Sequence, residues 1–155
     1  GAAALAADTR VVGEIPASGL FLKDTLRVEA VEDPLVSGVQ LYLADFNKPA
    51  LEKLSGDFSD PSTSSLGCAR VAPIVVKNID LGLGGQEVFN EARAIFGKNV
   101  VIKRVYDKKT RTLVYTSYAS KLAKKSDSNQ SSSRFKASLC AVSLELNDVG
   151  PGEDK

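Results

Sequence analysis

The chain has 155 residues, with 20 Lys and Arg against 19 Asp and Glu, so its net charge is only +1. A composition of 43% hydrophobic and 25% charged residues is typical of one folded domain and argues against disorder. Nucleic-acid binding draws most of its affinity from a basic excess, which this chain lacks. The chain has no His, which excludes Ser-His-Asp and Cys-His catalysis and metal sites built on His.

The first residues are small and apolar, and the sequence Ala4-Leu5-Ala6 fits the A-x-A pattern that precedes an export cleavage site. We therefore expect residues 1–8 to be the remnant of an export signal on a processed chain. An engineered start and a merely flexible terminus are the alternatives. No apolar stretch approaches the length of a membrane span, so we expect a chain that does not cross a membrane.

A short strand is predicted at residues 9–15, and two longer strands follow it. Residues 25–32 alternate, with Leu26 and Val28 on one side and Arg27 and Glu29 on the other. Residues 38–46 form the next strand, and the turn around Asp33 makes the pair antiparallel. We expect the adjacent carboxylates of this turn to be solvated.

The middle of the chain is less regular. Residues 47–56 are predicted to form a short helix, and residues 55–67 a polar loop. Residues 68–76 are strand-like, and Pro73 predicts an edge strand or a bulge. A Gly-rich connection at residues 78–86 follows. Residues 87–97 have helical spacing of apolar residues over too short a run to decide between helix and strand.

Residues 99–106 and 112–119 are rich in β-branched and aromatic residues, which predicts a β-hairpin at the centre of the domain. Five of its side chains are expected to be largely buried: Val101, Ile102, Val105, Leu113 and Val114.

An exposed loop at residues 121–133, a last strand at residues 135–146 and a polar tail at residues 147–155 complete the chain. The prediction is one mainly β domain over residues 9–146. It is an antiparallel β-sandwich or an open barrel with one or two short helices.

Motifs for cofactors and metals are weak. The run Gly82–Gly85 lacks the full dinucleotide-binding pattern, and a flexible connection is favoured. Asp57 and Asp60 lack the spacing of a calcium loop. We therefore predict no catalytic residue, no metal site and no cofactor.

Basic residues gather around the hairpin tip, with Arg104 among them. Together with nearby tyrosines they could bind nucleic acid, and a charged tip that prevents aggregation is the commoner interpretation. A third interpretation is a contact with an acidic protein partner. We predict that the interaction surface is made of Lys103, Lys108, Lys109 and Arg111.

The two cysteines, Cys68 and Cys140, are far apart, which excludes a C-x-x-C redox or zinc motif. In an exported protein two cysteines more often form a disulfide, whereas in a reducing compartment they are more often free thiols. We predict the disulfide, and two buried free thiols are the alternative.

Three stretches of the chain resemble the CreA family. They are residues 22–34 leading into 39–43, residues 60–74 around Cys68, and residues 105–121, with a Tyr-Asp turn before a Leu-Val-Tyr strand. The order and spacing of these stretches carry the resemblance, which runs from about Val11 to Val142. It implies a small exported protein, periplasmic in bacteria, for which the family supplies neither an established activity nor catalytic residues.

The chain departs from the bacterial pattern in its cysteines. The bacterial pattern has a cysteine in the strand that is occupied here by Gln40-Leu41-Tyr42, whereas this chain has Cys140 in its last strand instead. The sequence of residues 126–142 resembles the plant and algal form, which implies a chloroplast protein of the thylakoid lumen. We therefore expect a non-enzymatic accessory protein at a membrane complex, with a photosystem as that complex. The alternative is an exported β-domain that binds a small ligand.

Overall fold

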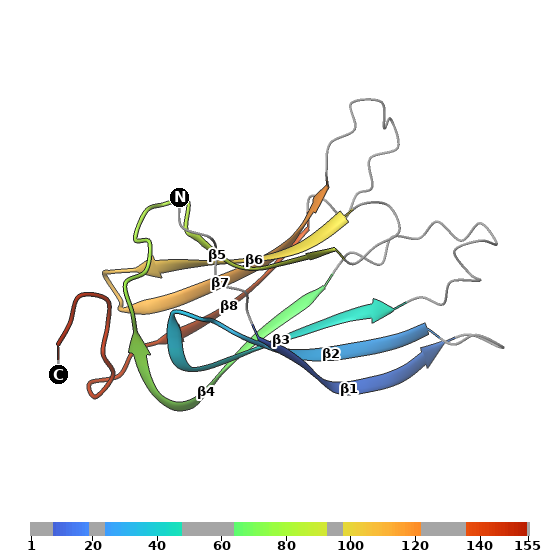
Figure 1. Cartoon of the computed structure of the whole chain (residues 1–155), viewed down its shortest axis with the longest axis horizontal. Helices are drawn as coiled ribbons and strands as arrows, with labels where there is room; N and C mark the ends of the chain where they lie inside the picture. The colour runs from blue at the N-terminus through green and yellow to red at the C-terminus, as the bar shows by residue number, and fades with distance from the viewer. Residues whose placement is uncertain (1–7, 19–23, 48–63, 93–97, 122–135, 155) are drawn as a thin grey trace.

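The computed structural model describes residues 8–18, 24–47, 64–92, 98–121 and 136–154, which form two four-stranded antiparallel sheets (Figure 1). The first sheet has the order β1 (Thr9–Ser18), β2 (Asp24–Glu32), β3 (Val36–Asn47) and β4 (Ser65–Val76). The second has the order β5 (Gln86–Ala92), β6 (Lys98–Asp107), β7 (Thr112–Lys121) and β8 (Ala137–Ser143). The predicted antiparallel sandwich is confirmed.

Each sheet is a meander in which strands that follow one another along the chain lie side by side. The predicted β2–β3 pair is confirmed, with Val31 opposite Leu41. The undecided run at residues 87–97 is a strand in its described part, since β5 pairs with β6. A register shift between Glu87 and Phe89 lets the two apolar neighbours Val88 and Phe89 both be buried, which explains why the sequence shows no alternation there.

The core lies between the two sheets, where apolar side chains from both inner faces pack together. The fully buried members are Val31, Leu41, Leu43, Ile74, Val100, Ile102, Leu113 and Tyr115. The expected burial of Val101, Ile102 and Leu113 is confirmed. Val105 and Val114, which lie opposite each other, are less completely buried than these three but are not exposed. Their neighbours Arg104 and Leu113 occupy the inner face instead, and alternation turns these valines outward.

Pro73 was predicted to lie in an edge strand or at a bulge. β4 is an edge strand, and its ladder with β3 shifts register between Ser37 and Val39. Gly38 faces this irregularity with a φ of 88°, and a Cβ there would lie 2.7 Å from the Ala72 carbonyl oxygen. The close approach of the two backbones therefore requires glycine at this position.

Several predictions fall on residues outside the described ranges. Asn47 ends β3, and the remainder of the helix predicted at residues 47–56 lies outside them, as do most of the loops predicted at 55–67 and 121–133. The described residues contain no helix, and hence none long and apolar enough to cross a membrane.

Candidate functional site

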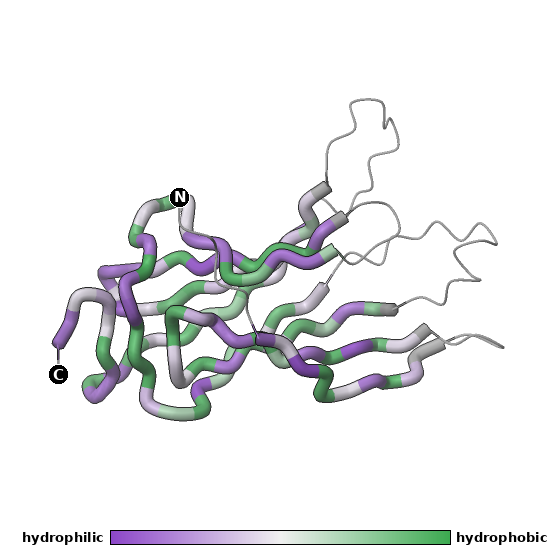
Figure 2. Tube along the Cα trace, in the orientation of Figure 1, coloured by the Kyte–Doolittle hydropathy of each residue, from purple (hydrophilic) through white to green (hydrophobic). Residues whose placement is uncertain are grey.

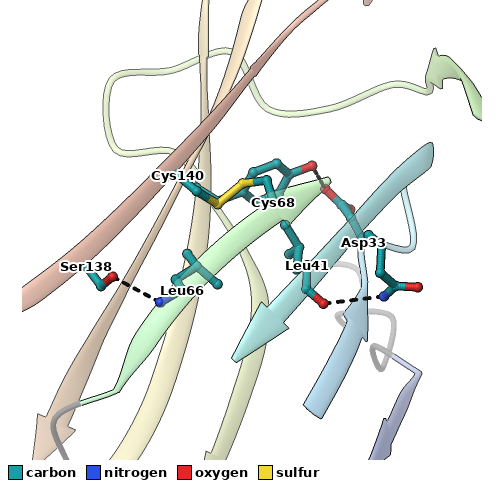
Figure 3. Close-up of a disulfide and its surroundings, with 8 residues drawn as sticks. Asp33, Leu41, Leu66, Cys68, Ser138 and Cys140 are labelled. Atoms are coloured by element: carbon teal, nitrogen blue, oxygen red, sulfur yellow. Dashed lines mark hydrogen bonds between the residues drawn. A yellow bond between two sulfur atoms is a disulfide. The ribbon is translucent and has the colours of Figure 1, made fainter. Parts of the chain in front are cut away.

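A disulfide joins the two sheets at one edge of the sandwich. Cys68 on β4 and Cys140 on β8 are bonded, with their Cα atoms 5.7 Å apart, so the predicted pairing is confirmed (Figure 3). β4 and β8 are the last strands of their sheets and belong to separate ladders. A hydrogen bond from the Leu66 amide to the Ser138 hydroxyl oxygen, 3.0 Å long, crosses the same seam. The covalent bond thus links two edges that share no backbone ladder.

A buried ion pair links the sheets close to the disulfide. Asp33, in the turn between β2 and β3, accepts hydrogen bonds of 2.7 Å from both Nε and Nη2 of Arg104 on β6. It also accepts one of 2.8 Å from the Tyr115 hydroxyl. The side chains of Asp33 and Arg104 are almost wholly inaccessible to solvent. The expectation of a solvated turn carboxylate is therefore wrong for Asp33, because the turn folds against the second sheet.

Arg104 was expected at the basic hairpin tip and is instead a core residue. It shares the inner face of β6 with Ile102, and its remaining Nη1 group donates a 2.7 Å hydrogen bond to Gln86 Oε1. Burial alone would lower the pKa of Arg104, but the hydrogen bonds and charge of Asp33 raise it above its ordinary value. Burial, followed by the charge of Asp33, raises the pKa of Tyr115 far above its usual range. Arg104 therefore stays charged, and Tyr115 stays a neutral donor.

A second carboxylate anchors the C-terminal segment. Asp148 is buried and accepts hydrogen bonds from Nη1 and Nη2 of Arg70, at 2.9 and 2.7 Å. It also accepts from the amides of Ile74 and Glu145, at 2.8 and 2.7 Å. The Arg70 hydrogen bond is the main cause that holds the pKa of Asp148 well below its usual range. Residues at the start of the predicted polar tail are thus packed against β4, where Val149 also forms a parallel bridge to Val75.

The predicted interaction residues are only partly brought together. Lys108 and Lys109 are exposed in the β6–β7 turn, and neither forms an ion pair within the described residues. Arg111 in the same turn has a φ of 50° and donates a 2.7 Å hydrogen bond to Glu153 Oε1. Lys103 lies apart from them on β6, half-buried, in register with Glu87 of β5. The structure therefore groups three of the four residues.

Three connections gather at one end of the sandwich, which we call the turn end: residues 77–85, 108–111 and 144–154 (Figure 1). The C-terminal segment reaches the β6–β7 turn, since Arg111 binds both Glu153 and the Glu145 carbonyl oxygen. Residues 77–85 enter β5 beside Arg104. Apolar and polar residues alternate over this end (Figure 2), and two of its leucines, Leu83 and Leu146, are almost fully exposed.

Both anchoring carboxylates are occupied by contacts within the protein. The buried carboxylates Asp33 and Asp148 are each saturated by an arginine and by further donors. Within the ranges that the structure describes, no three His, Cys, Asp or Glu side chains are grouped as a metal site would require. Sequence reasoning missed both anchoring networks, because their partners are 71 and 78 residues apart along the chain.

Comparison with known proteins shows the family to which this chain belongs. The family described as CreA protein matches residues 12–146, which include all strands from β2 to β8. The chain belongs to the CreA family. It is 30% identical over 104 residues to Protein CreA of Escherichia coli K12, and equally to the proteins of that name from strains O6:H1 and O157:H7. Each alignment covers 66% of this chain and 66% of the relative. No solved structure matches the chain.

Proposed function

We propose that this CreA-family chain is a non-enzymatic accessory protein that docks through its turn end onto an acidic surface of a membrane-bound protein complex. The observation that carries this proposal is the pair Lys108 and Lys109. They are exposed on a short turn and form no ion pair within the described residues, whereas Arg111 in the same turn is paired with Glu153. Unpaired cations attract an acidic partner and speed its association.

The turn that carries these lysines is held in one conformation. Asp107 accepts hydrogen bonds from the Lys109 amide, at 3.0 Å, and from the Thr110 hydroxyl, at 2.9 Å. Arg111 is fixed by Glu153 on the other side. A preorganised turn loses little conformational entropy on binding, which favours its use as a contact.

The compartment belongs to the same proposal. The disulfide supports an oxidising compartment outside the reducing cytosol. The resemblance of residues 126–142 to the plant and algal form of the family supports the chloroplast thylakoid lumen, with a photosystem as the complex. The bacterial periplasm is the alternative compartment. Binding of a small ligand by an exported β-domain is the alternative function.

The experiment is capture of detergent-solubilised membrane complexes by the immobilised, disulfide-bonded protein. We expect the double charge reversal Lys108→Glu/Lys109→Glu to reduce capture at least tenfold, and wild-type capture to weaken as salt screens the contact. The matched control is Arg10→Glu/Lys136→Glu, which reverses two exposed cations that both lie outside the turn end. Equal capture by the wild type and the Lys108→Glu/Lys109→Glu variant would reject the turn as the contact.

A further inference from the structure

β1 is an edge strand whose side chains lie outside the core. Among the described strands it pairs with β2 alone, and none of its described residues belongs to the buried cluster between the sheets (Figure 1). Three of its apolar side chains are largely exposed: Val11 at 51%, Val12 at 43% and Ile15 at 51%. Single exposed apolar residues need no explanation, but these three share one strand. The outer edge of β1 therefore presents apolar side chains together with backbone N–H and C=O groups that have no strand beside them.

The other three edges of the two sheets are closed or protected. β4 and β8 are joined to each other by the disulfide. β5 has 7 residues, against 10 in β1, and its apolar side chains Val88 and Phe89 are buried. The side chains that β5 exposes include Glu87, Asn90 and Glu91. A short strand with exposed charges is a common protection against pairing with another chain, and β1 has neither feature to the same degree.

A register shift in β1 places its two charged side chains on opposite faces of the sheet. Arg10 is in register with Ala30 and Glu14 with Arg27, so four positions along β1 correspond to three along β2. Side chains three positions apart on a regular strand point to opposite faces. Arg10 donates a long hydrogen bond of 3.5 Å to Gln40, and neither Arg10 nor Glu14 forms an ion pair within the described residues. A regular strand added to this edge meets the two charges with residues three positions apart.

A second copy of β1 is a poor match for this edge. Directly opposite side chains of an antiparallel pair point to the same face, so Arg10 of one copy cannot stand opposite Glu14 of the other. Two copies would also bring together two register shifts and two Pro16 residues, which have no N–H to donate. The edge is thus protected against its own sequence, whereas a regular strand from another chain meets these irregularities once.

The apolar row that ends at Ile15 specifies one further feature of the added strand. Ile15 is in register with Leu26, and Leu26 with Phe46, which is 45% exposed. These side chains form an apolar row across three strands. An apolar residue opposite Ile15 extends this row, whereas a charged one interrupts it.

We infer that the free edge of β1 binds an extended strand of a second protein, which adds antiparallel to the first sheet. This strand carries an apolar residue opposite Ile15, a basic residue opposite Glu14 and, three positions after the basic residue, an acidic residue opposite Arg10. Backbone hydrogen bonds provide the affinity, and the side-chain pairs set register and direction. This contact goes beyond the proposed docking of the turn end and shares no residue with it. Because it is tested without any membrane complex, the two proposals stand or fall separately.

The probe is a fluorescently labelled peptide of sequence Thr-Val-Lys-Val-Val-Glu-Thr, titrated with the disulfide-bonded protein and followed by fluorescence anisotropy. We expect Ile15→Asp to weaken binding by about tenfold, because it places a charge in the apolar row. The matched control is Leu139→Asp, since Leu139 is 61% exposed on β8, and it should leave binding unchanged. No binding of the peptide by the wild type, or an equal loss in both variants, overturns the inference.

Exchange of the two charges tests the register. A peptide with its Lys and Glu exchanged should bind the wild type about tenfold more weakly, and the variant Arg10→Glu/Glu14→Lys should prefer the exchanged peptide by a similar factor. Equal affinity of both peptides for both proteins would reject the predicted register.

Methylation of the peptide's backbone nitrogens tests the strand addition itself. An added strand turns only alternate N–H groups toward its neighbour, so methylating one alternate set should abolish binding and methylating the other should not. Equal effects of the two sets would mean that the peptide does not extend the sheet. Sedimentation velocity of the protein alone covers the remaining case: a wild-type dimer that Ile15→Asp dissociates would assign the edge to a second copy and overturn the inference.

Discussion

Two neighbouring links, one covalent and one ionic, join the two sheets. The disulfide connects β4 to β8, and the cluster of Asp33, Arg104 and Tyr115 connects the β2–β3 turn to β6 and β7. They are neighbours, because Tyr115 lies in register with Cys140. The covalent link acts largely by restricting the unfolded chain and does not depend on its surroundings for charge balance. The ionic link stabilises the fold only while it is complete, because each buried charge needs the other.

This difference assigns the two links different roles. A buried ion pair often contributes little more than apolar side chains of the same volume would, so its net stabilisation is small although its loss is costly. Asp33 accepts four hydrogen bonds with defined directions, from Arg104, Tyr115 and the Leu35 amide. We interpret the ionic link as the one that fixes how the β2–β3 turn sits on the second sheet, and the disulfide as the one that keeps the sheets together.

The largest effect is expected on removing the carboxylate of the ionic link. Asp33→Ala leaves the guanidinium of Arg104 buried without a counter-charge and the Tyr115 hydroxyl without its acceptor. We expect the free energy of unfolding to fall by about 5 kcal/mol in urea denaturation. Glu32→Ala, an exposed carboxylate next in the chain, is the control and should change it by less than about 0.5 kcal/mol. A loss below about 1 kcal/mol for Asp33→Ala would mean that Arg104 finds another partner.

Removing the covalent link should cost slightly less. The cysteines are 72 positions apart, and the chain-entropy relation gives about 4 kcal/mol for closing a loop of that size. We expect Cys68→Ala/Cys140→Ala to lose about that much stability in urea denaturation while retaining the native circular dichroism spectrum. A variant as stable as the wild type would show that packing along β4 and β8 alone holds the seam.

The sequence predicted the strands and the covalent link but missed the ionic link, for a physical reason. Alternating and β-branched patterns are local, so the hairpin and the β2–β3 pair follow from neighbouring residues. The disulfide follows from there being only two cysteines. Asp33 and Arg104 each have an ordinary local explanation, a turn residue and a basic strand residue. Only their contact across 71 positions shows that both are buried.

In the candidate site, too, some features follow from local sequence and others depend on contacts between distant residues. The exposed pair Lys108 and Lys109 follows from a charged segment between two strong strands. Arg111 was predicted as part of the interaction surface, yet it pairs with Glu153, and this pairing depends on how the C-terminal segment returns to the turn. Arg104 has the same parity on its strand as Val100 and Ile102, which face the core, but Val101 of the other parity is buried as well, so the sequence alone did not show which face is the inner one.

The third prediction concerns how the stability that Asp148 contributes depends on pH. Asp148 has a lowered pKa in the folded protein, so its carboxylate adds stability that is complete above the ordinary Asp value near 4. That contribution is lost as the pH falls below this value toward the folded pKa. Asp148→Asn should therefore cost about 2 kcal/mol at pH 7 and progressively less in acid, measured by urea denaturation at several pH values. A cost that is the same at pH 7 and at about pH 2 would contradict the assignment.

The smallest effect is expected from the hydroxyl of Tyr115, and it tests whether the ionic link behaves as a unit. Tyr115→Phe keeps the buried ring and removes one of the four hydrogen bonds to Asp33, so we expect a loss of about 1 kcal/mol. Tyr118→Phe, on the half-buried outer face of β7, should change stability by less than about 0.5 kcal/mol. In the Asp33→Ala background the hydroxyl has no acceptor, so Tyr115→Phe should then cost nothing or stabilise the protein. The same loss in both backgrounds would mean that the hydroxyl acts independently of Asp33, and the link would then consist of the Asp33–Arg104 pair alone.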